Sequence, residues 1–173
     1  QRVLDQLKGA PELVIDPRFN EVQTDEQIEV MMPLLIDRDA RFADLVAAMD
    51  TDTKSFQKII ESVFNYWVSP DCDVSGIQSW EDYHRGVVSA FEGAMASAVS
   101  GSDTAIFTSG GTIATIVGHV LKLTSDRVYE FYEPVFNCSI TRIIFNSRKC
   151  SLSTFNDVGH LHLMSAQLKE RLV

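Results

Sequence analysis

Cysteines, cations and long apolar runs are all scarce in this 173-residue sequence. Its three cysteines are odd in number and show no close pairing or metal-ligand spacing, which favours a reduced, cytoplasmic protein over a secreted one. No stretch approaches the roughly 18 apolar residues that a membrane-spanning helix needs. The sequence has 15 Lys and Arg but 24 Asp and Glu, so its net charge is -9. Nucleic acid and anionic membrane surfaces would be repelled by this charge, which argues against them as partners.

Internal repeats, low-complexity stretches and Gly/Ser linkers are absent from the sequence as well, so it offers no boundary between domains. We therefore expect a single domain over residues 1–173. Its 45% hydrophobic and 23% charged residues are ordinary for a soluble globular fold, and the chain is long enough to bury a core. Neither nucleotide-binding glycine pattern, Gly-x-Gly-x-x-Gly or the P-loop with its Lys, occurs.

Helical patterns fill much of the chain. Apolar residues at helical spacing predict amphipathic helices at residues 41–49 and 55–67, and a further helix that begins at Trp80. Shorter helical segments are predicted towards the two ends of the sequence, at residues 3–7 and 165–173. Packing against a sheet is the expected purpose of these apolar stripes.

Two capping-box patterns predict where helices start. Thr24 has Gln27 three positions later, and Ser79 has Asp82 at the same spacing. The helix that opens at Thr24 is expected to end near residue 32, because the residue before Pro33 is disfavoured in helical conformation.

Strand patterns alternate with the helical ones. Short apolar or alternating runs predict strands over residues 13–15, 105–107, 137–145 and 150–155. The last two strands are expected to be joined by a hairpin connection at residues 147–149. Interleaved helices and strands are typical of an α/β fold. We therefore expect a doubly wound, largely parallel sheet with helices on both faces.

A Gly-Gly turn is the most informative local feature. Residues 104–123 have the pattern of a buried strand that passes through Gly110 and Gly111 into an apolar helix. The free N–H groups and the dipole at such a helix start attract a phosphate oxygen, and glycines let the backbone approach it. Ser109 and Thr112 add hydroxyls at the same place. A tight strand-to-helix connection with no ligand is the alternative interpretation.

The four histidines do not form a convincing metal site. His160 and His162 would lie on one side of an extended segment, but no carboxylate or cysteine completes a ligand set. His119 lies ten residues beyond Ser109 and cannot act at the Gly-Gly turn. We interpret the histidines as structural or solvent-exposed, and we expect neither a metal nor a cofactor.

Four segments in order resemble the histidine phosphatase superfamily, also called phosphoglycerate-mutase-like. They are Phe19-Asn20-Glu21, the helix that begins at Ser79-Trp80, the turn Ser109-Gly110-Gly111, and the closing runs at residues 137–142 and 155–161. Together they cover most of the chain. The resemblance implies a phosphoglycerate-mutase-like sandwich, with the active site at the carboxyl ends of the strands.

The resemblance also implies a mechanism. Such enzymes use a His nucleophile in an Arg-His-Gly motif to form a phosphohistidine, and a Glu to protonate the leaving group. It implies that Glu21 is the catalytic acid and that Ser109 and Gly110 bind phosphate.

Two departures from that pattern stand out. No Arg-His-Gly triplet occurs in the 173 residues, and Ser109 replaces the His of the family's Ser-His-Gly-Gly turn. A hydroxyl donates a hydrogen bond but carries no positive charge. Since the resemblance implies that the triplet precedes Gln1, we expect both the nucleophile and the N-terminal strand upstream of the sequence.

These patterns predict a cytoplasmic phosphatase that hydrolyses a small phosphate monoester through a phosphohistidine intermediate. The alternative is a non-catalytic pseudoenzyme that binds a phosphate ligand. The expected partner is a small phosphorylated substrate, with neither nucleic acid nor a membrane, and a homodimer is left open. Substrate specificity is expected to reside in residues 37–77.

Overall fold

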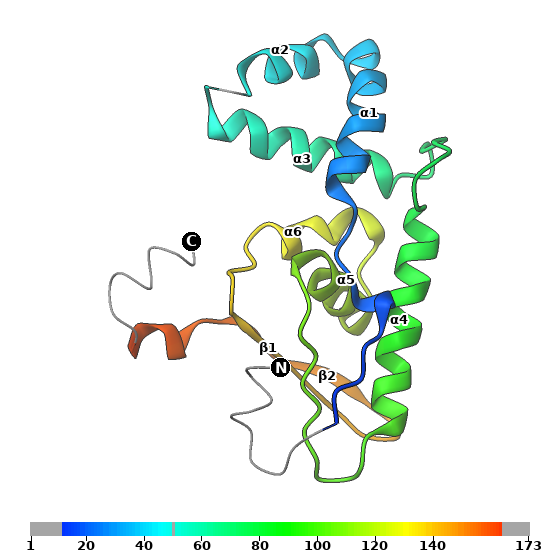
Figure 1. Cartoon of the computed structure of the whole chain (residues 1–173), viewed down its shortest axis with the longest axis vertical. Coiled ribbons are helices and arrows are strands. Elements are labelled where there is room, and N and C mark those ends of the chain that lie inside the picture. Colours follow the sequence, from blue (N-terminus) through cyan, green and yellow to red (C-terminus); the bar gives the residue numbers. More distant parts are fainter. Residues whose placement is uncertain (1–11, 50, 164–173) are drawn as a thin grey trace.

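The structure, a computed structural model, describes residues 12–49 and 51–163 (Figure 1). It is a mixed, helix-rich fold with a small two-stranded sheet. The α-helices of the described residues are α1 (Thr24–Arg38), α2 (Ala40–Ala48), α3 (Thr53–Trp67), α4 (Trp80–Ser97), α5 (Gly110–Leu121) and α6 (Tyr129–Tyr132). The strands are β1 (Ile140–Phe145) and β2 (Cys150–Asp157). Short 3-10 helices span Pro17–Phe19, Ser125–Arg127 and Gly159–Leu163. The helical segments predicted at residues 3–7 and 165–173 lie outside the described residues.

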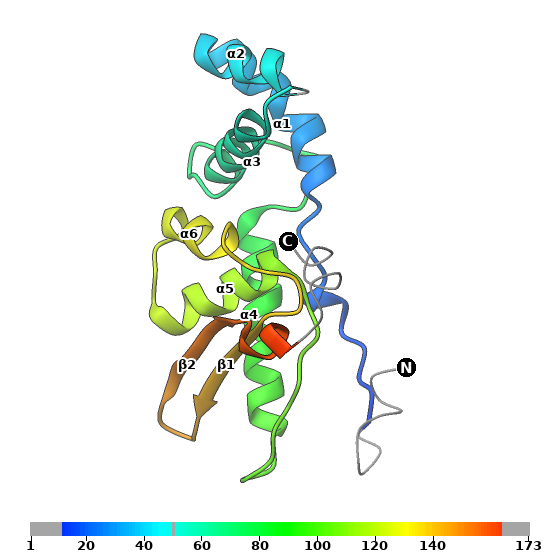
Figure 2. The same cartoon turned by 90° about the vertical axis from the view of Figure 1, so that its left-hand side faces the viewer.

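The helices form two groups. Helices α1, α2 and α3 pack on one another at one end of the molecule, and the sheet lies towards the other end against α4 and α5 (Figures 1 and 2). Helix α5 contacts α4, α6 and β2, and most of its side chains are buried. The start of α5 is therefore held rigidly near the centre of the fold.

Aromatic side chains make up the part of the core that joins the two groups. Phe64 and Trp67 extend from α3, and their rings lie 6.0 and 5.2 Å from the ring of Trp80 at the start of α4. Tyr83 lies 5.6 Å from Trp67, and Tyr129 lies 5.3 Å from Phe64. The edge-to-face geometry of Trp80 with Phe64 and with Trp67 adds to the stabilisation that burial alone provides.

The predicted helices at residues 41–49 and 55–67 are confirmed as α2 and α3. The capping pattern at Ser79 is also confirmed, because its hydroxyl accepts a hydrogen bond from the backbone N–H of Asp82 at 3.1 Å. At the other predicted start, α1 does begin at Thr24, but no side chain caps it.

The predicted end of α1 near residue 32 is wrong. The helix continues through Pro33 to Arg38. Proline removes one backbone hydrogen bond, but Met31 is completely buried and Leu35 packs on the same core. Packing of the apolar face outweighs the local preference of the residue before proline.

The hairpin is confirmed, whereas the larger sheet is not shown. β1 and β2 pair antiparallel with Ile143 opposite Leu152, and the Asn146 N–H closes the turn on Lys149 at 2.8 Å. Residues 13–15 and 105–107 form no strand in the described part of the chain. An extended segment becomes a strand only when a neighbouring backbone supplies hydrogen-bond partners, and within residues 12–49 and 51–163 neither segment has one.

None of the helices in residues 12–49 and 51–163 is both long enough and apolar enough to cross a lipid bilayer.

Val87 tests the packing of α4 against α5. Its side chain is completely buried, so Val87→Ala removes packed atoms and leaves a cavity, and we expect it to lower the free energy of unfolding by about 2 kcal/mol. Urea denaturation measures this loss. Val99→Ala is the control, since Val99 is 75% exposed, and it should change stability by less than about 0.5 kcal/mol. Equal effects at both positions would contradict the described packing.

Candidate active site

The loop that carries Glu21 is shaped by an aspartate-capped turn. Asp16 accepts a hydrogen bond from the Arg18 backbone N–H at 3.0 Å and pairs with the Arg18 guanidinium at 2.6 Å. The hydrogen bond from that guanidinium lowers the pKa of Asp16. Arg18 also donates to Ser89 of α4 at 3.2 Å. The turn is therefore tied to α4 just before the chain reaches Glu21.

Three hydrogen bonds then fasten the loop to the start of α5. The Thr108 hydroxyl donates to the carbonyl of Phe19 at 2.6 Å, and the Thr112 hydroxyl donates to the carbonyl of Asn20 at 3.0 Å. The Gly111 N–H donates to the Glu21 carboxylate at 3.1 Å. We call this set the loop-helix clasp. It positions the side chain of Glu21 at the Gly-Gly turn.

Glu21 lies at the positive end of the α5 dipole. Its Oε1 accepts from the backbone N–H of Val22 at 2.8 Å and from that of Gly111, and its Oε2 lies 3.3 Å from the Gly111 nitrogen. A negative charge is favourable in this position. Within the described residues, neither the Gly110 N–H nor the Ser109 hydroxyl has a hydrogen-bond partner. Both groups therefore have donors available for a ligand.

The hydroxyls of Thr112 and Tyr83 form a buried pair on the core side of the clasp. Thr112 is completely buried, and its oxygen lies 2.9 Å from the Tyr83 hydroxyl of α4. Because Thr112 donates its proton to Asn20, Tyr83 is the donor in this pair. Burial raises the pKa of Tyr83, so the donor remains protonated.

Tyr132 of α6 closes one side of the site. A Cβ added at Gly110 would lie 3.2 Å from its ring, so the glycine leaves room for the ring to pack against the turn. Burial raises the pKa of Tyr132, and the charge of Glu21 acts in the same direction.

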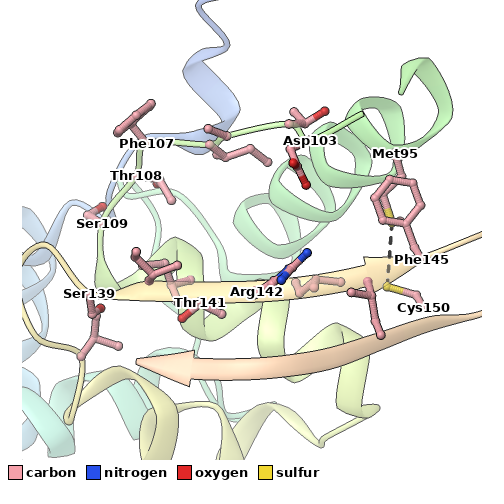
Figure 3. Close-up of a pocket in the computed structure, with 18 of the residues that line it drawn as sticks. Met95, Asp103, Phe107, Thr108, Ser109, Ser139, Thr141, Arg142, Phe145 and Cys150 are labelled. Carbon is pink, nitrogen blue, oxygen red and sulfur yellow. Dashed lines mark hydrogen bonds between the residues drawn. The ribbon is translucent and has the colours of Figure 1, made fainter. Parts of the chain in front are cut away.

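Glu21, Ser109 and Gly110 line one end of a cavity of about 2300 Å³. The cavity continues between residues 98–109 and β1, with Ser139 across from Ser109 (Figure 3). The structure thus brings together the three residues that sequence analysis predicted for the site. Among the described residues, no histidine lines this cavity.

Sequence analysis missed several residues at this site. No motif in the sequence indicates that Tyr83, Tyr132 or Ser139 belongs to the site. The Ser139 hydroxyl is buried without a hydrogen-bond partner in the described part of the chain, and the preceding Cys138 has a left-handed backbone with φ 61°. The hydroxyl of Thr112, predicted at the turn, faces the loop and the core. Only its position directly after the glycines could have indicated this buried role.

The described histidines lie elsewhere. His84 and His119 have ring centroids 6.5 Å apart on α4 and α5, and His119 approaches Glu92 at 3.6 Å. Burial lowers the pKa of His84, and the proximity of His119 lowers it further. Within residues 12–49 and 51–163, no three His, Cys, Asp or Glu side chains gather in a way that could hold a metal ion.

Comparison with known families identifies the class of protein. The sequence profile of the histidine phosphatase superfamily (branch 1) matches residues 21–158, most of the chain. The chain therefore belongs to the histidine phosphatase superfamily. Membership supports a phosphoglycerate-mutase-like phosphatase or mutase in general terms and implies an α/β fold. No curated protein and no solved structure matches the chain.

Gly111 tests the clasp. A Cβ at this position would overlap Oε1 of Glu21 and lie 2.9 Å from the Val22 side chain. We expect Gly111→Ala to lower the free energy of unfolding by about 1–3 kcal/mol, measured by urea denaturation.

Gly93→Ala is the matched control. Gly93 also lies inside a helix, but a Cβ there meets nothing within 4 Å, so the substitution should stabilise the protein by about 0.5–1 kcal/mol. Stabilisation by both substitutions would show that Glu21 does not lie against Gly111.

Proposed function

We propose that this protein is a phosphatase that hydrolyses a small phosphate monoester through a phosphohistidine intermediate. The observation that carries the proposal is the Glu21 carboxylate, which lies on the first turn of α5 beside the free donors of Ser109 and Gly110. Phosphoryl transfer to and from an imidazole needs an acid that protonates the leaving group and donors that hold the phosphoryl oxygens. In this proposal Glu21 is the acid and the start of α5 supplies the donors, on the same cavity wall. Superfamily membership supports the same reaction class.

The nucleophile in this proposal is a histidine upstream of Gln1, because the 173 residues contain no Arg-His-Gly triplet. Its neutral imidazole attacks phosphorus while the ester P–O bond breaks. Glu21 gives a proton to the departing alkoxide. In the second step a water molecule attacks the phosphorus of the phosphohistidine while the P–N bond breaks, and Glu21 takes a proton from that water. Inorganic phosphate leaves, and the imidazole is neutral again.

The two oxygens of Glu21 are suited to different tasks. Oε1 receives the two shorter hydrogen bonds, from Val22 and Gly111, and anchors the side chain. Oε2 has only the longer contact with Gly111 at 3.3 Å, so it is the oxygen that carries the transferable proton in our proposal. Ser109 and Gly110 hold the phosphoryl oxygens by their hydroxyl and N–H groups.

A pseudoenzyme that binds a phosphate ligand is the second candidate. The observation in its favour is Ser109, which stands where the superfamily's turn has histidine. A serine hydroxyl supplies one hydrogen bond but no positive charge to a phosphoryl transition state. Binding survives such a replacement more readily than catalysis does.

Glu21→Gln tests the role of the acid. Because an aryl phosphate has a good leaving group and an alkyl phosphate a poor one, we expect the substitution to lower kcat on the alkyl phosphate at least tenfold more than on the aryl one. Steady-state assays on the full-length protein measure both rates. Glu133→Gln is the control, since Glu133 is an exposed carboxylate that lines the same cavity. Equal losses on the two substrates would show that Glu21 is not the proton donor.

Ser109→Ala separates the two candidate functions. In a phosphatase the loss of one hydrogen bond should raise the barrier by about 1–2 kcal/mol, which is roughly a five- to thirtyfold loss of rate. In a pseudoenzyme the background rate should stay unchanged while phosphate affinity, measured by calorimetry, falls. Complete loss of activity, on the scale of removing a nucleophile, would instead make Ser109 the catalytic residue.

Ser109→His provides the complementary variant. It restores the superfamily's residue and should raise the phosphatase rate if the ring is accommodated beside Thr108. A rate that stays at background in the wild type and in both Ser109 variants would favour the pseudoenzyme.

A further inference from the structure

Helices α3 and α6 line one end of the 2300 Å³ cavity, the end that adjoins the Gly-Gly turn. Helix α6 contacts both α5 and α3 and lies between them in the fold (Figure 1). A Cβ at Gly110 would lie 3.2 Å from the ring of Tyr132 and 3.7 Å from the Cβ of Val135. Whatever binds at this end of the cavity therefore lies next to the candidate active site.

Apolar and aromatic side chains dominate this end of the cavity, which we call the apolar recess. It is formed by Gln57 and Ile60 of α3, Tyr129 and Tyr132 of α6, and Val135 and Phe136 of the loop that follows. Phe64 of α3 fixes the two tyrosines, since its ring lies 5.3 Å from that of Tyr129 and 5.9 Å from that of Tyr132. Asn156 of β2 holds the loop by accepting a hydrogen bond from the Phe136 N–H at 2.9 Å. The recess is therefore preformed, as small-molecule pockets usually are.

The charges around the apolar recess are negative. Glu21 and Glu133 line the same end of the cavity, and none of the described residues that α3 and α6 contribute to the cavity is a lysine or arginine. Burial raises the pKa of Tyr129, and the charges of Glu133 and Glu61 act in the same direction. A second anionic group on a ligand would be repelled by these carboxylates, whereas an uncharged group would not.

The positively charged side chains that line the described cavity lie on β1 and on its turn with β2. Figure 3 shows Arg142 further along β1 than Ser139, and Arg148 and Lys149 belong to the turn that joins the two strands. Because a strand rises about 3.3 Å per residue, the six residues of β1 separate that turn from the α6 end by roughly 20 Å. A small ligand that extends from Gly110 into the recess therefore points away from these cations.

We propose that the apolar recess binds the alcohol portion of the substrate, and that this portion is an uncharged apolar or aromatic group without a second phosphate or carboxylate. The inference rests on the proposed function, because it assigns the substrate class of the same site. With the phosphoryl oxygens on Ser109 and Gly110, the ester oxygen lies towards Glu21 and the carbon skeleton continues into the recess. Burial of that skeleton against Tyr132 and Phe136 removes apolar surface from water and so favours binding.

Calorimetry on the full-length protein with three non-hydrolysable phosphonates tests the inference without turnover. Benzylphosphonate carries an aromatic group, 2-hydroxyethylphosphonate a small polar group, and phosphonoacetate a second anionic group. We expect benzylphosphonate to bind about tenfold or more tightly than 2-hydroxyethylphosphonate, because its ring buries apolar surface in the recess. Phosphonoacetate should bind most weakly, because its carboxylate approaches Glu133 and Glu21.

Phe136→Ala tests whether the ring binds in the recess. It should lower the affinity for benzylphosphonate about fivefold or more and leave the affinity for 2-hydroxyethylphosphonate within about twofold. Phe107→Ala is the matched control, since Phe107 is an exposed phenylalanine that lines the same cavity outside the recess, and it should change neither affinity. Because Phe136 is 45% exposed, its substitution should leave the fold intact, which urea denaturation checks.

Phosphonoacetate that binds as tightly as benzylphosphonate, or more tightly, would overturn the inference, because the site would then accept a second anionic group. Equal effects of Phe136→Ala and Phe107→Ala on benzylphosphonate affinity would also overturn it, because the ring would not lie in the recess.

The fate of the proposed function is measured separately. The expected order of affinities in a protein that hydrolyses no phosphate ester would support the inference and contradict the proposed phosphatase. Hydrolysis of phosphate esters together with the wrong order of affinities would contradict the inference alone. Failure of all three phosphonates to bind would overturn both.

Discussion

The hydrogen bond between the Gly111 N–H and the Glu21 carboxylate joins two segments that lie 90 positions apart in the chain. This bond places the carboxylate of Glu21 against the first turn of α5. Thr108 and Thr112 hold the same loop by its carbonyl groups, and Tyr83 supports Thr112 from within the core. The position of the candidate acid is thus fixed by backbone and buried hydroxyl groups, and the charge of Glu21 is matched by the helix dipole.

The proposed anion site is compatible with the negative net charge of the protein. In our proposal the attraction for phosphate is local. It comes from oriented N–H groups at the start of α5, and the cavity beside them is also lined by Arg142, Arg148 and Lys149. The same cavity is lined by the candidate acid, Glu21, and by Ser109 and Gly110, the residues that we propose to bind phosphate.

Local signals in the sequence were sufficient for much of the fold. Apolar periodicity located α2, α3 and α4, the Ser79 cap located the start of α4, and the β1–β2 hairpin followed from alternation around a short turn. The end of α1 could not be predicted, because burial of Met31 overrides the local effect of Pro33. The parallel sheet remains a prediction, since pairing depends on backbone partners distant in sequence. For the site, the Gly-Gly turn and the resemblance indicated Glu21, Ser109 and Gly110, whereas the support from Tyr83 and Tyr132 arises only in three dimensions.

A crystal structure of the full-length protein with orthovanadate tests the central claim most directly. Our account predicts a tetrahedral or trigonal vanadate next to α5, with oxygens about 3 Å from the Ser109 hydroxyl and the Gly110 N–H and with Oε2 of Glu21 facing the anion. An upstream histidine should approach the vanadium from the opposite side. A structure in which protein groups cap the Ser109 and Gly110 donors, leaving no room for the anion, would contradict the account.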